Sequence, residues 1–185
     1  MNYHIRKTGL TFLISVLIAL NAIAQKMDHS WEQIVMSDDT AWFGTHEAKQ
    51  IADNVLLFQR NIGGWPKNTA MYKTLTDKQK EDLLKLKSST KGCTIDNGAT
   101  YMEMTFLSKV YRQQPDEKYK NAFLAGLNYI LEAQYDNGGW PQFYPLRKGY
   151  YSHITFNDDA MVNILKVLRE IADESGYYSI KVPKE

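Results

Sequence analysis

Two short acidic segments carry the side chains best suited to binding a metal ion. The first supplies Asp96 and Asn97, and the second, 61 residues later, supplies Asp158 and Asp159. Carboxylate and amide oxygens are hard ligands, and a site built from them favours Ca²⁺. The pattern therefore predicts a calcium site, provided that the fold brings the two segments together.

The same residues also have a structural explanation, because Asp and Asn are favoured at helix N-termini. Each segment stands where an apolar helical pattern begins, so each taken alone suits a helix cap as well as a ligand. Two adjacent aspartates, Asp158 and Asp159, are more than one cap requires. The sequence leaves both interpretations open at this point.

A second group of candidates combines aromatic and basic side chains in loops. Aromatic faces pack against sugar rings, and Lys or Arg pairs with carboxylates, so the combination suits an acidic polysaccharide. Trp65 and Trp140 are better explained as structural plugs at helix ends, whereas Tyr150 and Tyr151 suit packing and sugar contact equally. The loop residues that we expect to bind substrate are Lys67, Tyr144, Arg147 and His153.

Helical periodicity dominates the rest of the chain and must supply the scaffold for these loops. No convincing β-hairpin is present, and we expect at most a short strand pair within 140–156. The expected fold class is therefore all-α. Apolar residues recur at helical spacing in five segments, 46–59, 76–87, 99–111, 116–134 and 159–174.

An internal repeat relates two of the loops. Gln59-Arg-Asn-Ile-Gly-Gly-Trp-Pro-Lys67 returns 75 residues later as Gln134-Tyr-Asp-Asn-Gly-Gly-Trp-Pro-Gln142. Glycine permits a positive φ at the end of a helix, tryptophan covers that end, and proline prevents the helix from continuing. Helical hairpins repeated in this way build an α/α toroid with long loops gathered on one face.

Composition and missing motifs exclude several other functions. The 22 Lys+Arg balance 21 Asp+Glu, which argues against binding nucleic acid through phosphate neutralisation. Cys93 is the only cysteine, so we expect no internal disulfide and a buried, unreactive thiol. The sequence contains no Gly-x-Ser-x-Gly elbow, Walker loop or His-Glu-x-x-His motif.

Residues 1–24 are typical of a secretory signal peptide. Basic residues precede an apolar run from Leu10 to Leu20, and Ala22-Ile-Ala24 suits signal-peptidase cleavage before Gln25. The apolar run is short for a membrane anchor, which needs about 20 residues. We therefore expect a secreted or periplasmic bacterial protein that is monomeric and leaves the membrane after cleavage.

Together these segments resemble the pectate lyases of polysaccharide lyase family 10. The resemblance covers roughly residues 30–180, and the run from Gly138 to Met161 is highly specific. It implies an α/α toroid, a requirement for Ca²⁺, and cleavage of polygalacturonate by β-elimination. On the matching positions it implies that the calcium and substrate site contains Asp96, Asn97 and Asp158, with Asp159 as a further metal ligand.

The reaction explains why this family needs a cation and a base. The C5 proton of a galacturonate is a very weak acid, and a cation on the adjacent carboxylate stabilises the charge that its removal creates. The resemblance implies an arginine base beyond Glu185, since neither Arg60 nor Arg147 matches its motif. We therefore expect residues 25–185 to be the N-terminal part of a pectate lyase catalytic domain.

Two other functions remain as alternatives. The same loops on a partial toroid would make a non-catalytic module that binds acidic polysaccharides without cleaving them. Terpene cyclases also carry a Gln…Gly-Gly-Trp repeat on an α/α barrel. The signal peptide and the lack of an Asp-x-Asp-Asp motif argue against that class.

Overall fold

The computed structural model describes residues 30–176 and 178–182, with the side chain of Asp158 left out. The predicted signal peptide lies outside the described residues. The described part contains α-helices and short 3-10 turns, and its β-pairing is limited to isolated bridges. Its elements are α2 (Trp31–Val35), η2 (Trp42–Gly44), α3 (His46–Phe58), α4 (Asp77–Lys85), η3 (Asp96–Gly98), α5 (Tyr101–Gln113), α6 (Glu117–Glu132), η4 (Tyr150–Ser152), η5 (Asn157–Asp159) and α7 (Ala160–Ala172).

Helices α3 to α7 confirm the five predicted helices, with boundaries that differ by a few residues. The sequence analysis missed α2, which is too short to show a helical period. A reciprocal pair of hydrogen bonds between Ser30 and Gln33 starts that helix. The strand pair expected within 140–156 is wrong in extent, because it consists of one bridge between Pro141 and Ile154.

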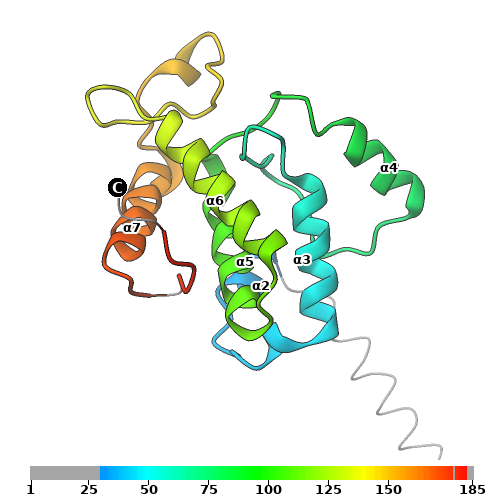
Figure 1. Cartoon of the computed structure of the whole chain (residues 1–185). Coiled ribbons are helices and arrows are strands. Elements are labelled where there is room, and N and C mark those ends of the chain that lie inside the picture. Colours follow the sequence, from blue (N-terminus) through cyan, green and yellow to red (C-terminus); the bar gives the residue numbers. More distant parts are fainter. Residues whose placement is uncertain (1–29, 177, 183–185) are drawn as a thin grey trace, which may run out of the picture.

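Helix α5 forms the centre of the core. Every residue from Tyr101 to Val110 is buried, and α2, α3, α6 and α7 all contact this helix. Figure 1 shows that the loop after α6, the following segment in yellow and the start of α7 gather at the upper end of the bundle. The helices therefore form a scaffold whose chemistry-bearing loops meet at one end. No helix of the described residues is long and apolar enough to cross a membrane.

The two copies of the repeat fold into matching corners. The glutamine that ends each helix donates a hydrogen bond to a glycine carbonyl, Gln59 to Gly63 at 2.9 Å and Gln134 to Gly138 at 3.1 Å. Both glycines have positive φ, 95° and 86°. At Gly63 an added Cβ would lie 2.0 Å from the carbonyl oxygen of Ala125, so no other residue fits this corner.

The tryptophans of the repeat tie each corner back to its helix. The indole of Trp65 donates to the carbonyl of Val55, and that of Trp140 to the carbonyl of Ile130, both at 2.8 Å. Both tryptophans are 0% exposed. This burial confirms that they are structural plugs and leaves no ring surface for a ligand.

Three isolated antiparallel bridges join the loops of the two repeats in series. Proline has no N–H to donate, which limits such pairing to single bridges where it takes part. Because each bridge connects neighbouring loop segments, together they bring the acidic segments of both repeats to one place. The bridged pairs are Pro66–Cys93, Thr94–Phe143 and Pro141–Ile154.

Cys93 confirms its expected role as a small buried residue. Its side chain is free of disulfides and 1% exposed. Burial raises the pKa of its thiol to about 11, so the reactive thiolate is scarce at neutral pH. The thiol therefore contributes packing beneath the loops and takes no part in nucleophilic chemistry.

Candidate functional site

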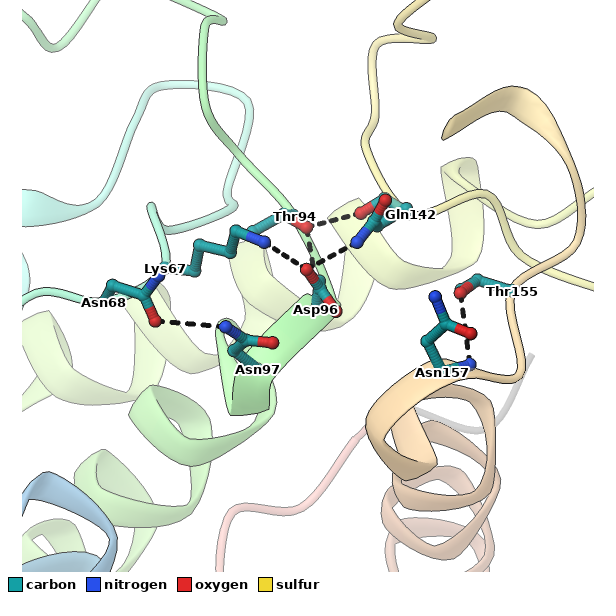
Figure 2. Close-up of polar contacts among 8 residues, drawn as sticks. All are labelled: Lys67, Asn68, Thr94, Asp96, Asn97, Gln142, Thr155 and Asn157. Atoms are coloured by element: carbon teal, nitrogen blue, oxygen red, sulfur yellow. Dashed lines mark hydrogen bonds and ion pairs between the residues drawn. The ribbon is translucent and has the colours of Figure 1, made fainter. Parts of the chain in front are cut away.

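The two acidic segments meet, as a shared metal site requires. They form the turns η3 and η5, which contact each other, and η3 also contacts α7. Figure 2 shows Asp96 on the first turn and Asn157 at the start of the second, with the residues that contact them. Chain segments about 60 residues apart in the sequence thus form one end of the bundle.

Asp96 is the best-defined side chain of this site. It is 1% exposed, and its Oδ2 atom accepts hydrogen bonds from the ammonium group of Lys67 and from Nε2 of Gln142 (Figure 2). Its backbone N–H donates to the hydroxyl of Thr94 at 3.0 Å. Lys67 and Gln142 hold the same position in the two repeat copies, so both repeats converge on one carboxylate.

Gln142 is a site residue that the sequence analysis missed. Its carbonyl accepts hydrogen bonds from the hydroxyl of Thr94 and from the backbone N–H of Ile95, while its own N–H donates to the carbonyl of Tyr151. These bonds hold its side chain over Asp96. The signal was present in the repeat, since Gln142 aligns with the candidate Lys67.

A left-handed segment shapes the chain between the first acidic turn and α5. Asn97, Gly98 and Thr100 have φ values of 51°, 81° and 72°. A positive φ is uncommon for a β-branched residue such as threonine, and strain of this kind concentrates at functional sites. It delays the start of α5 to Tyr101, two residues after the predicted start. Asn97 also donates from Nδ2 to Oδ1 of Asn68 at 3.2 Å.

Thr100 keeps this strained conformation through three hydrogen bonds. Its hydroxyl donates to the carbonyl of Thr94 at 2.9 Å and accepts from the backbone N–H of Trp65 at 3.3 Å. Its own N–H donates to Oε2 of Glu103 at 2.7 Å, and the other carboxylate oxygen of Glu103 accepts from the indole of Trp31. The site is therefore built into the first turn of the central helix.

Glu103 should make the stability of the chain depend on pH. Burial raises its pKa from 4.5 to about 7, against the lowering effect of its hydrogen bonds. The folded state then binds a proton more tightly than the unfolded state, so stability falls as pH rises from about 4.5 to 7. The full effect is about 3 kcal/mol.

We expect Glu103→Gln to flatten this dependence. The check is urea denaturation of both proteins at several pH values between 4 and 8. Equal slopes of unfolding free energy against pH in the two proteins would show that another group is responsible.

A cleft of about 360 Å³ opens beside the first acidic turn, between α2, the loop after Pro66 and the start of α5. Its lining combines amide and ammonium groups with aromatic rings, which is the combination that suits a charged sugar. Lys67 borders this cleft and also contacts Asp96, so it links the two features. The lining includes Trp31, Lys67, Asn68, Tyr72, Asn97 and Glu103.

The acidic residues do not act as helix caps where their side chains are described. Asp96 is engaged by Lys67 and Gln142, and Asp159 is exposed and makes no capping hydrogen bond to α7. Among the described side chains, no three of the types His, Cys, Asp and Glu form a metal-binding group. The calcium prediction thus depends on Asn97 and Asp158 as well. The donor set is oxygen-only and lies on two turns in contact, and it fits Ca²⁺.

The remaining substrate-binding candidates lie on the loop between Gln142 and η5. Tyr144 is half-buried, its ring packs on Tyr129 at 5.8 Å between centroids, and its carbonyl accepts from the Tyr129 hydroxyl. Arg147 and His153 are exposed. The structure therefore places Lys67 on Asp96, gives Tyr144 a packing role, and leaves Arg147 and His153 open to solvent.

Known proteins show where this arrangement occurs. A family described as pectic acid lyase matches residues 59–183. A mutant of the family 10 polysaccharide lyase from Cellvibrio cellulosa, solved in complex with trigalacturonic acid, is 33% identical over 79% of this chain, with a TM-score of 0.59. A second structure of a family 10 lyase from Cellvibrio cellulosa is 36% identical over 76% of this chain, with a TM-score of 0.57.

The chain spans 40% and 43% of the length of these two solved chains. No curated protein matches this sequence. The likeness to the solved structures confirms the predicted all-α, toroid-type fold. Because the family match covers most of the sequence, the chain belongs to the pectic acid lyase family.

Proposed function

We propose that this chain carries the calcium and substrate site of a secreted pectate lyase that cleaves polygalacturonate by β-elimination. The observation that supports it most is the buried carboxylate of Asp96, which Lys67 and Gln142 orient where two acidic turns meet. Family membership and the trigalacturonic acid bound to a similar lyase support an acidic oligosaccharide as substrate.

Each residue of the site has a role that its chemistry explains. Asp96, Asn97, Asp158 and Asp159 would hold the cation, which supplies charge stabilisation at the substrate carboxylate. Lys67 has a side chain that is 30% exposed, so its ammonium group both orients Asp96 and reaches the solvent where an acidic sugar arrives.

The proton acceptor is proposed to be an arginine supplied from outside residues 1–185. The arginines near the loops support this placement. Arg60 is 8% exposed and donates to the carbonyl of Phe58 at the end of α3, which makes it a structural residue. Arg147 packs on aromatic rings, 4.3 Å from the centroid of Tyr151.

Removal of calcium should abolish cleavage by the complete protein. Activity is followed by the ultraviolet absorbance of the unsaturated product, with polygalacturonate as substrate. We expect a calcium chelator to stop the reaction and added Ca²⁺, but not Mg²⁺, to restore it. Saturated products would contradict the lyase class, and full activity in chelator would contradict the metal requirement.

Binding without cleavage is the second candidate function, favoured by the lack of a matching arginine base in this sequence. The same experiment separates the two proposals. A chain that binds polygalacturonate in Ca²⁺ and releases no unsaturated product would support the binding module. Export is a further proposal, which N-terminal sequencing of the secreted protein would test by finding Gln25 as its first residue.

A further inference from the structure

An aromatic and cationic stack covers the loop that follows Gln142. The Tyr150 and Tyr151 rings lie 4.0 Å apart between centroids, and Phe143 meets Tyr151 edge-on at 5.4 Å. The guanidinium carbon of Arg147 lies 4.3 Å from the Tyr151 centroid and 5.3 Å from that of Phe143. These contacts hold a planar cation in a fixed place on the surface.

The charge of Arg147 is not neutralised within the described part of the protein. Its guanidinium makes no ion pair or hydrogen bond with another described residue, and its contacts are with aromatic faces. From residue 137 to residue 157 the sequence contains no Asp or Glu, while it contains Arg147, Lys148 and His153. This segment therefore offers its N–H donors to an anion from solution.

The stack is attached to the site around Asp96. The N–H of Gln142, whose side chain contacts Asp96, donates to the carbonyl of Tyr151 at 3.2 Å. The ammonium group of Lys67 lies 5.6 Å from the centroid of Phe143. The pKa of Tyr150 is raised, chiefly by its hydrogen bond with Tyr151 and also by the negative charge of Asp96. The stack and the calcium candidates thus share one surface.

We propose that Tyr150 and Arg147 form an additional subsite for one uronic acid residue of the polysaccharide, next to the calcium site. Tyr150 is 60% exposed and presents its ring to the apolar face of the sugar. Arg147 donates two parallel hydrogen bonds to the sugar carboxylate. The proposal rests on the proposed function, because it takes polygalacturonate as the ligand.

The test is the affinity for hexagalacturonate in saturating Ca²⁺, measured by isothermal titration calorimetry on the protein and four variants. We expect Arg147→Ala to weaken binding about tenfold and Tyr150→Ala about fivefold. Arg147→Lys keeps the charge but loses the planar fork, so binding should weaken about threefold. Lys148→Ala is the matched control, and it should change affinity by less than about twofold.

The outcomes separate this subsite from the proposed function. Unchanged affinity in Arg147→Ala, or an equal loss in Lys148→Ala, would overturn the subsite and leave the proposed function intact. A protein that binds no hexagalacturonate at all would overturn the proposed function and the subsite with it. Circular dichroism and Ca²⁺ titration of each variant should match the unmodified protein, since both residues lie outside the calcium candidates.

Discussion

Replacement of Asp96 by alanine should lower the lyase activity of the complete protein about 100- to 1,000-fold. The buried carboxylate is the side chain on which Lys67 and Gln142 converge. Its removal would delete a proposed calcium ligand and leave the ammonium group of Lys67 without its acidic partner. The measurements are initial rates of elimination and calcium affinity by calorimetry.

Two further variants make this prediction specific. Asp96→Asn keeps the shape of the side chain and removes its charge, so we expect calcium affinity and activity to fall almost as far as in Asp96→Ala. Asp82→Ala is the control, because Asp82 is an exposed carboxylate of α4 paired with Lys78 and Lys85. Loss of that surface pair should leave both quantities unchanged. Calcium affinity retained by both Asp96 variants would remove Asp96 from the metal site.

Replacement of Trp140 by alanine should cost about 3–5 kcal/mol of unfolding free energy. The indole is 0% exposed, plugs the end of α6, and donates to the carbonyl of Ile130. Trp65→Ala should cost a similar amount, since the first corner has the same contacts around Val55. Equilibrium urea denaturation, followed by far-ultraviolet circular dichroism, gives the difference.

The components of this loss can be separated with two variants. Trp140→Phe keeps most of the packing and loses the indole hydrogen bond, and we expect a smaller cost of about 1–2 kcal/mol. Leu84→Ala removes a side chain from a residue of α4 that is 55% exposed, and its effect should stay within about 0.5 kcal/mol. A cost below about 1 kcal/mol for Trp140→Ala would show that the plug is not structural.

Helices with several turns were predictable from the sequence, and the short elements were not. Helix α6 alternates buried and exposed residues at helical spacing, so its period identifies it. Helix α2 has five residues and is specified by a cap instead of a period. The start of α5 was misplaced because the conformation of Thr100 comes from its tertiary hydrogen bonds with Trp65 and Thr94.

The candidate site was predictable as a set of residue types, whereas its wiring was not. Asp96 stood out because of its neighbours and its repeat. That Lys67 and Gln142 both reach it depends on the bridges between loops, which no local pattern encodes. Glu103 sits in a helical segment where a charged side chain is ordinarily solvent-facing, yet it is 2% exposed because α5 is surrounded by other helices.

The inert thiol of Cys93 makes this chain a convenient background for site-specific labelling. Maleimide reagents need an accessible thiolate, and Cys93 is 1% exposed with a raised pKa. A cysteine introduced at Lys148, beside the aromatic stack, would then be the one reactive site among the described residues. A fluorophore attached there would report the arrival of an oligosaccharide without any need to remove the native cysteine.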